Sequence, residues 1–123
     1  MTINKAIRFA LSIFPYECYY NTYTGTDETY LVFNYTMVPD AYSDDEPEYN
    51  RYLCQVHFYA PFTFNSIAIS QQIKQVLEDA GFTYPEQTDA SDEEGQHIVF
   101  EFEGIEFIDR QMVRAYTMMA VSF

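Results

Sequence analysis

Positive charge is scarce in this chain. Its 123 residues include six Lys and Arg against 19 Asp and Glu, so the formal net charge at pH 7 is −13. Proteins that bind nucleic acids rely on Lys and Arg to neutralise phosphates, and an anionic membrane surface repels an acidic protein. The composition therefore argues against tight contact with DNA or with a membrane. It is compatible with a surface past which DNA slides without sticking.

Cysteine and long apolar runs are also rare. The two cysteines, Cys18 and Cys54, form no CxxC pair and have no His at a zinc-binding spacing, which fits a reduced, cytosolic protein without a zinc site. No apolar run approaches the roughly 20 residues that span a bilayer. Because the first residues, MTINKAIRFAL, contain no long apolar segment followed by a cleavage site, we expect no signal peptide.

Aromatic residues, in contrast, are abundant. The chain is 48% apolar and 19% aromatic, with 12 Tyr, 11 Phe and no Trp. This is enough to build a core, and the length suits one domain, residues 1–123. A Tyr-rich composition is typical of half-buried strands and also of protein interfaces, because the ring packs while the hydroxyl stays hydrated. Both interpretations are open at this point.

Two segments have the periodicity of amphipathic helices. In residues 3–14 apolar side chains recur at helical spacing, Thr2 is a suitable N-cap and Pro15 ends the helix. Residues 66–80 form the second predicted helix, with Asn65 as the expected cap. The buried stripe expected on this second helix consists of Ile69, Ile73, Val76, Leu77 and Ala80.

Alternating apolar and polar residues predict strands. The predicted strands are residues 29–38, 49–60, 82–87 and 96–104. Pro85 limits the third of them to a sheet edge. Residues 16–26 fit an edge strand or an extended connection, and residues 107–123 fit a strand or a helix equally well. The expected fold is therefore α+β: a small mixed, mainly antiparallel sheet packed by two helices, in the order α-β-β-α-β-β.

The alternation also assigns side chains to faces. On the first strand one face carries Leu31, Phe33, Tyr35 and Met37 and the other carries Tyr30, Val32, Asn34 and Thr36. On the second strand Tyr52, Cys54, Val56, Phe58 and Ala60 share the apolar face, and on the last strand Ile98, Phe100 and Phe102 point inward. The opposite face carries His57, His97, Glu101 and Glu103. Residues 39–48, PDAYSDDEPE, are predicted to form a solvated hairpin loop; the alternative is that this loop docks onto a neighbouring subunit.

No group of residues predicts catalysis. The acidic segments 40–48 and 89–95 suggest calcium, but neither has the alternating ligand positions of a calcium loop. The two histidines are predicted on different strands, and no nucleophile lies in a turn beside either. A phosphate-binding loop and a nucleophile elbow are also missing. We therefore expect a non-enzymatic protein that has no metal and no cofactor.

Several segments of the sequence resemble segments of a known protein family. The succession YLVFNYT, DDEPEYNRYLCQVHFYAPFTFNS, QQIKQVLEDAGFTYPE and GQHIVFEFEG spans roughly residues 29–104. It resembles small proteins of the head–tail module of long-tailed phages and prophages: tail terminator, tail completion and minor capsid proteins. The segment after Phe107 departs from this resemblance.

The resemblance implies a structural function. Such proteins form a hexameric ring that caps the tail tube, stops its growth and docks onto the head connector. The expected partners are thus other copies of the chain, the tail tube and the connector, and the expected location is the virion neck, with assembly in the host cytoplasm. A ring of acidic chains would repel phosphates, which suits a conduit for DNA better than a DNA reader.

Two groups of residues are candidates for this function. Asp44, Asp45, Glu46, Pro47 and Glu48 are expected at a subunit or connector interface. Glu101 and Glu103 are expected to face the channel. The alternative function is an acidic adaptor or inhibitor that binds a basic protein, although many of the acids cluster in two loops rather than along one face. A calcium-binding or small-ligand module is a third hypothesis, resting on the acidic turns alone.

Overall fold

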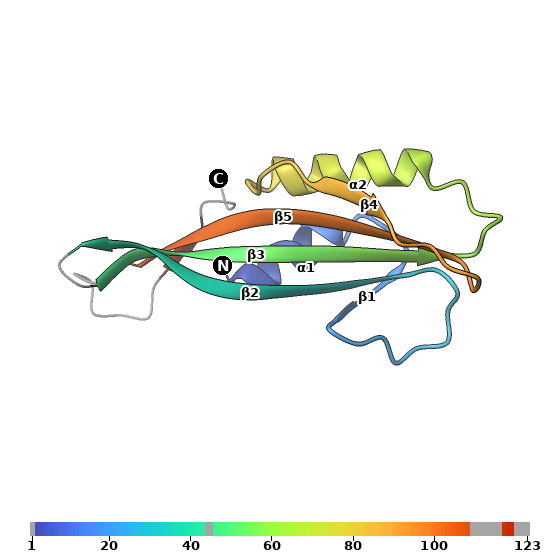
Figure 1. The fold of residues 1–123 in the computed structure, drawn as a ribbon, viewed down its shortest axis with the longest axis horizontal. Coiled ribbons are helices and arrows are strands. Elements are labelled where there is room, and N and C mark those ends of the chain that lie inside the picture. The colour runs from blue at the N-terminus through green and yellow to red at the C-terminus, as the bar shows by residue number, and fades with distance from the viewer. Residues whose placement is uncertain (1, 44–45, 109–116, 120–123) are drawn as a thin grey trace.

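The structure is a β-sheet with two helices packed on one of its faces (Figure 1). A computed structural model describes residues 2–43, 46–108 and 117–119 of the chain. The elements in chain order are α1 (Ile3–Leu11), β1 (Glu17–Tyr20), β2 (Tyr30–Ser43), β3 (Glu46–Ala60), α2 (Ile67–Asp79), β4 (Glu86–Asp89), β5 (Gln96–Ile108) and β6 (Thr117–Met119). The predicted α+β class is confirmed, and β1 and β6 are additions to the predicted order.

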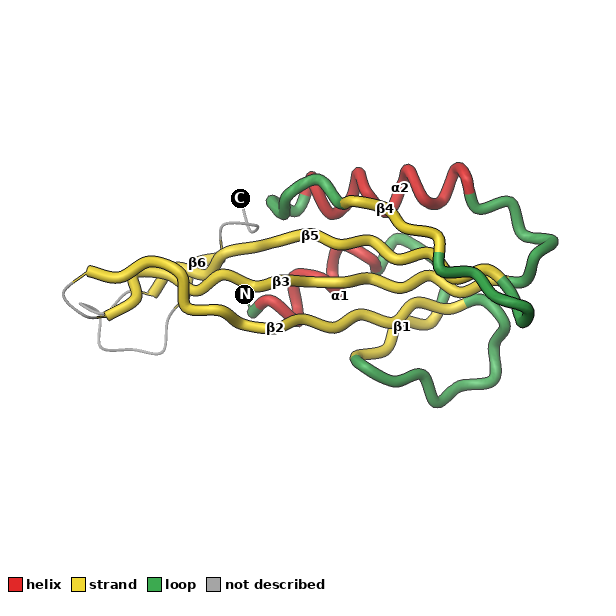
Figure 2. Tube along the Cα trace, in the orientation of Figure 1, coloured by secondary structure: helices red, strands yellow, loops and turns green. Residues whose placement is uncertain are grey.

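The strands of the sheet are arranged as β1-β2-β3-β5-β4, and β6 pairs with the end of β5. β1 runs parallel to β2, and every other pairing between the described strands is antiparallel. The sheet is therefore mixed and mainly antiparallel, as predicted. β4 precedes β5 in the chain but lies outside it, so that β5 is inserted between β3 and β4 (Figure 2).

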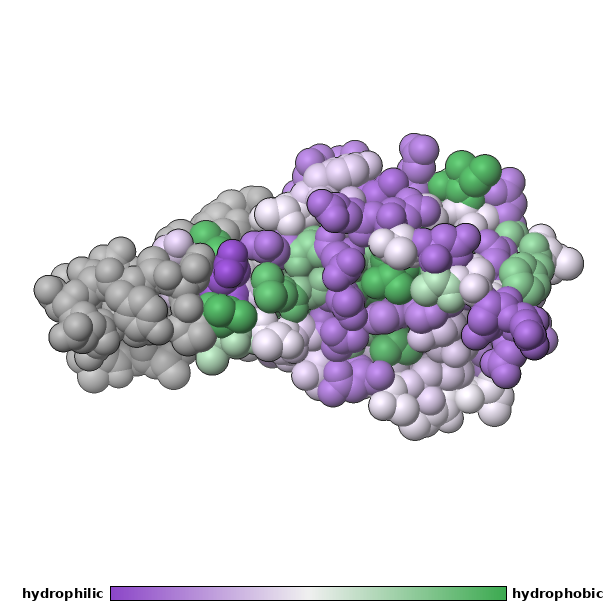
Figure 3. All heavy atoms as spheres, in the orientation of Figure 1, coloured by the Kyte–Doolittle hydropathy of each residue, from purple (hydrophilic) through white to green (hydrophobic). Residues whose placement is uncertain are grey.

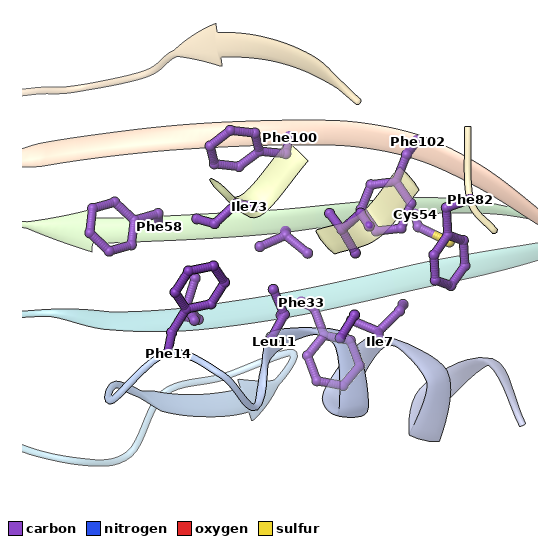
Figure 4. Close-up of a cluster of buried hydrophobic side chains, with 14 of the residues drawn as sticks. Ile7, Leu11, Phe14, Phe33, Cys54, Phe58, Ile73, Phe82, Phe100 and Phe102 are labelled. Carbon is purple, nitrogen blue, oxygen red and sulfur yellow. The ribbon is translucent and has the colours of Figure 1, made fainter. Parts of the chain in front are cut away.

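Both helices contribute to one hydrophobic core. Phe33, Phe58 and Phe100 are fully buried on three neighbouring strands and face side chains from α1 and α2. Figure 4 shows Ile7 and Leu11 of α1 and Ile73 of α2 reaching into the same layer. The predicted inward alternation of β3 and β5 is confirmed by the buried residues Tyr52, Cys54, Val56, Phe58, Ala60, Ile98, Phe100 and Phe102. Met37, on the same face of β2 as the buried Leu31 and Phe33, is 51% exposed.

The first helix ends earlier than predicted. Thr2 is its N-cap and accepts a hydrogen bond from the amide of Lys5, as expected, but the helix stops at Leu11 rather than Phe14. The amide of Ser12 donates to the carbonyl of Phe9, three residues back, and its Oγ donates to the same carbonyl at 2.6 Å. This tightened turn closes the helix before Pro15 is reached. Phe14 still enters the core.

The predicted loop at residues 39–48 is instead mostly strand. β2 continues to Ser43 and β3 starts at Glu46, with register shifts beside Ala41. Pro39 is compatible with this pairing because a proline fits an edge strand where its missing N–H would point away from the partner. The two strands therefore continue the hairpin through the acidic segment, which composition alone assigned to solvent.

β4 begins at Glu86, four residues later than the predicted strand, which started at Phe82. Phe82 is buried in the core, and the amide of Thr83 donates to the carbonyl of Glu103. Pro85 lacks an N–H and so interrupts regular pairing between this contact and β4. The second helix agrees with prediction within one residue at each end; its N-cap is Ser66, and Asn65 Oδ1 accepts from the amide of Ile67.

The far ends of β2, β3 and β5 extend beyond both helices and form an arm (Figures 1 and 2). We define this arm as residues 38–43, 46–51 and 105–108 together with β6. It starts beside Gly104, against whose backbone the side chains of Phe82 and Ile3 pack closely. The strand pairing of β6 accounts for part of the C-terminal segment that sequence left undecided.

Candidate functional site: the uncovered face of the sheet

The face of the sheet opposite the helices carries no packed element in the described part of the chain (Figure 1). We call it the uncovered face. Its side chains, read from the strand alternation, are Tyr30, Val32, Asn34, Thr36, Arg51, Leu53, Gln55, His57, Tyr59, Glu86, Thr88, His97, Val99, Glu101 and Glu103. Figure 3 shows hydrophilic side chains mixed with isolated apolar ones across it. Both predicted channel-facing acids therefore lie on one exposed surface.

A shallow hollow of about 760 Å³ lies on this face. It is lined by residues of β2, β3 and β5 and of the segment around β4. Its acids are Glu86, Glu101 and Glu103, and none of the described lining residues is Lys or Arg. Arg51, just beyond the hollow, lies 3.7 Å from Glu103. The hollow is consequently acidic, with Leu53 as an exposed apolar contact in its floor.

Next to the hollow, two histidines form a hydrogen-bonded pair. His57 Nδ1 lies 2.8 Å from His97 Nε2 on the neighbouring strand. His57 Nε2 lies 3.2 Å from Gln55 Oε1 and 3.3 Å from Asn34 Nδ2, so it can donate to the first or accept from the second. Gln55 Nε2 in turn donates to Glu101. The polar side chains thus form a chain from a carboxylate to His97.

The histidine pair is partly desolvated, which affects its protonation. Burial lowers the pKa of His57, the neighbouring His97 lowers it further, and Glu101 opposes the shift. Burial also lowers the pKa of His97, against the opposing charges of Asp92 and Asp89. The pair is therefore mostly neutral at pH 7, and a proton on one ring disfavours a second proton on the other.

Stacked aromatic rings continue the row of side chains across three strands. Tyr23 stacks on Tyr30 with centroids 3.7 Å apart, and Tyr30 stacks on Tyr59 at 4.7 Å. Tyr59 stacks on His97 at 4.2 Å. Because both faces of Tyr30 and Tyr59 are covered, only their edges and hydroxyls are available to a partner. The stack holds the loop before β2 against the sheet.

A second, smaller hollow of about 320 Å³ lies at the end of this stack. Tyr30, Tyr59 and His97 line it together with three acids, Glu28, Asp92 and Glu94. These acids come from two loops that are more than 60 residues apart in sequence, and the fold brings them to one place. The fold thus adds Glu28 to the acids of the 89–95 segment, and the two hollows are two acidic positions on the described surface.

Three of the five predicted interface residues lie on the described part of the arm. Glu46, Pro47 and Glu48 form the start of β3, where Glu46 pairs with Ser43 and Pro47 with Tyr42. Asp44 and Asp45 lie outside the described residues. The arm thus presents this acidic segment beyond the core, rather than folding it back against the helices (Figure 1).

In residues 2–43, 46–108 and 117–119, no group of three or more His, Cys, Asp or Glu is placed to hold a metal ion. Neither described helix is long and apolar enough to cross a membrane. The described hydrogen-bond partners of the two imidazole rings are each other, Gln55 and Asn34, and the hydroxyl of Ser91 accepts from the backbone amide of His97.

Comparison with known proteins adds no identification. No protein-family model matches the chain, and no curated protein matches it with a significant score.

Sequence reasoning placed both histidines on the correct face but missed that they touch. His57 pairs in register with Val99, and Tyr59 pairs with His97, so the two histidines are diagonal neighbours. The signal that could have revealed the contact is the register of β3 against β5, since residue numbers in each facing pair add to a constant. Individual strand patterns do not contain this information.

Proposed function

We propose that this protein is a non-enzymatic subunit of a phage or prophage tail, acting as a tail terminator or tail completion protein that assembles into a ring at the head–tail junction. In this assembly the uncovered face lines the channel and the arm contacts a neighbouring subunit, the tail tube or the connector. The charge of the ring keeps DNA from sticking to its wall.

The observation that carries the proposal is the uncovered face itself. Its acids Glu86, Glu101 and Glu103 surround one hollow, and its base Arg51 is next to Glu103. A surface of this charge repels phosphates rather than binding them. The sequence resemblance over residues 29–104 supports the same function independently. The arm supports it as well, because a projecting strand pair suits contact with another subunit.

The first test is the mass of the purified protein in solution. Light scattering over a concentration series at low and moderate salt is expected to show a ring-sized species, favoured when salt screens repulsion between acidic chains. The same measurement is repeated with tail-tube protein. A monomer at high concentration that is still monomeric with the tube protein contradicts the proposal.

The second test concerns the channel. In the double variant Glu101→Lys/Glu103→Lys, the assembled protein is expected to gain salt-sensitive affinity for duplex DNA, because four units of charge change per chain on the channel wall. The matched control is Glu93→Lys/Glu94→Lys, which makes the same charge change in the exposed turn before β5. Equal DNA binding by both variants argues against a channel-facing position for Glu101 and Glu103.

A second candidate function is an acidic adaptor that binds a basic protein segment. The smaller hollow favours it, since Glu28, Asp92 and Glu94 converge there and none of its described lining residues is Lys or Arg. This function requires a monomer that binds an Arg-rich peptide in a 1:1 ratio. The triple variant Glu28→Gln/Asp92→Asn/Glu94→Gln should then lose that binding, whereas the ring function requires no such peptide.

A further inference from the structure

The outer edge of β2 is open for most of its length. β1 pairs with residues 30–33 of β2, and the amide of Asn21 adds one bond to the carbonyl of Phe33. Beyond Phe33, no described strand pairs with this edge of β2, which continues to Ser43. An exposed strand edge is a template for pairing with another chain, and proteins that stay monomeric usually block it.

Along β2, the backbone N–H and C=O groups of successive residues point alternately to the two sides of the strand, which identifies the groups that are free on the outer edge. Since the carbonyl of Phe33 points outward to Asn21, residues two and four positions later, Tyr35 and Met37, also point their N–H and C=O groups outward. Thr36, between them, bonds to β3 instead. Pro39 is the next residue in outward phase, and its lack of an N–H ends the free ladder there.

The opposite edge of the sheet has a matching free segment. β4 pairs with β5 alone, and the amide of Ala90 donates to the carbonyl of His97. By the same alternation Thr88 faces β5, while Gln87 and Asp89 point their backbone groups away from the sheet. Each free edge therefore presents two residues separated by one other residue. Their backbones offer two N–H donors and two C=O acceptors to a partner strand.

Charge indicates which partner suits the β2 edge. β2 is 14 residues long and contains one charged residue, Asp40, in a chain whose net charge is −13. A basic partner would be drawn to the acids elsewhere on the molecule. A second copy of this acidic chain, in contrast, is repelled least where the surface is nearly neutral, as along β2. The β4 strand of that second copy contains two acids, Glu86 and Asp89.

We propose that the chain assembles by pairing the free edge of β2, at Tyr35 and Met37, with the β4 edge of a second copy, at Gln87 and Asp89. This inference rests on the proposed ring function and specifies its subunit contact. The two strands meet antiparallel, because β2 runs parallel to β5 and β4 runs opposite to it. Tyr35 faces Asp89 and Met37 faces Gln87, which gives four backbone hydrogen bonds.

The contact joins two different edges, so it is heterologous and repeats from copy to copy. Within one chain, the register of the paired strands aligns Thr88 of β4 with Val99 of β5, His57 of β3 and Val32 of β2. The intermolecular pairing instead sets Thr88 opposite Thr36 of the neighbouring β2. Each copy is thus displaced by four residues, about 13 Å, along the strands. A ring accommodates such a displacement when its strands are tilted against the ring axis.

Disulfide trapping tests the pairing directly. Thr36 and Thr88 are exposed on the uncovered face and are expected to lie opposite each other across the contact. Under mild oxidation, a mixture of Thr36→Cys and Thr88→Cys chains should give cross-linked dimers, and neither variant alone should. Dimers from Thr36→Cys alone would indicate a two-fold β2–β2 contact and overturn the proposal.

A proline variant tests the backbone bonds. Met37→Pro removes an outward N–H and leaves the ladder between β2 and β3 intact, whereas Met37→Thr changes the same exposed side chain and keeps the N–H. Met37→Pro should raise the concentration needed for assembly about tenfold or more, and Met37→Thr should leave it nearly unchanged.

The outcomes separate the contact from the function. A ring that forms without the mixed cross-link, or that tolerates Met37→Pro, overturns this contact while the ring function stands. A chain that remains monomeric with its tail partner overturns both. Circular dichroism and the melting temperature of each variant establish that it is folded before assembly is measured.

Discussion

His57 and His97 lie with two ring nitrogens 2.8 Å apart, close enough that only one proton fits between them. A single added proton is tolerated, since the charged His57 ring can donate to both Gln55 and His97. A second proton sets two N–H groups against each other. The pair consequently resists double protonation. The nearby carboxylates of Asp89, Asp92 and Glu101 act in the opposite direction, because they favour the charged form of the rings.

The first prediction is a loss of stability in mild acid. The pKa values of both histidines are lowered by folding, whereas in the unfolded chain they stay near 6.5. Below pH 6.5 the unfolded state therefore binds more protons, and the free energy of unfolding falls as the pH drops toward the folded pKa values. Melting temperatures measured from pH 7.5 to 5.0 should show a decline of several degrees.

The control for this prediction is the variant His97→Gln, which keeps a polar side chain beside His57 and removes one titrating ring. Its melting temperature should depend less on pH than that of the natural chain across the same range. Identical profiles for the two proteins would show that carboxylates, and not the histidine pair, set the response.

The second prediction concerns Gln96, which fixes the connection between β3 and α2. Its Nε2 donates to the carbonyls of Pro61 and Phe64, and its Oε1 accepts from Ser66 Oγ at 2.7 Å. Gln96→Ala should cost about 1–3 kcal/mol of unfolding free energy in urea titrations, because three partners lose their bonds. Gln96→Glu should cost more, since it sets a carboxylate oxygen against two carbonyls.

Gln87→Ala serves as the matched control for Gln96, because Gln87 is exposed on β4 and has no side-chain hydrogen bond among the described contacts. Its effect should remain within about 0.5 kcal/mol. Equal effects at the two positions would mean that the Gln96 bonds do not contribute to stability.

The third prediction is that Gly104 tolerates no side chain. A Cβ at this position would lie 2.6 Å from Phe82 Cε1 and 3.3 Å from Ile3 Cδ1, both buried in the core. Gly104→Ala should therefore cost about 1–3 kcal/mol through overpacking. The double variant Gly104→Ala/Phe82→Leu should be more stable than the sum of the two single effects, measured by thermal or urea unfolding. Strict additivity would contradict the predicted clash.

The fourth prediction is low thiol reactivity in the folded chain. Burial raises the pKa of the Cys54 thiol to about 12 and that of Cys18 to about 11, where the Arg8 charge partly opposes the shift. Since the thiolate is the reacting form, alkylation at pH 8 should be about two orders of magnitude slower in the folded chain than in urea. Cys54→Ser identifies which thiol reacts first; rapid labelling of both in the folded chain would be inconsistent with their burial.

The strands and helices were predictable because their patterns are local. The spacing of Ile69, Ile73 and Leu77 and the alternation around Phe58 and Phe100 report directly on the side that faces the core, and these positions are buried as expected. Boundaries were less predictable. The end of α1 depends on the Ser12 bonds to Phe9, which a periodicity cannot show.

What the sequence did not reveal depends on pairing between distant residues. The hairpin continues through the acidic residues 39–48 because β2 and β3 support each other, although composition there favours a loop. The His57–His97 pair and the gathering of Glu86 with Glu101 follow from the order of β3, β5 and β4. Strand order is a property of the whole chain, and local propensity does not encode it.

The position of β5 between β3 and β4 has a consequence for synthesis on the ribosome. One edge of β3 has no partner until β5, which starts at Gln96, has left the exit tunnel. β4 is synthesised before β5 and likewise has no strand to pair with until β5 emerges. The sheet can therefore close only after β5 has been synthesised. Until then β3 is exposed to other nascent chains, so that premature termination before Gln96 should yield insoluble fragments rather than a smaller folded domain.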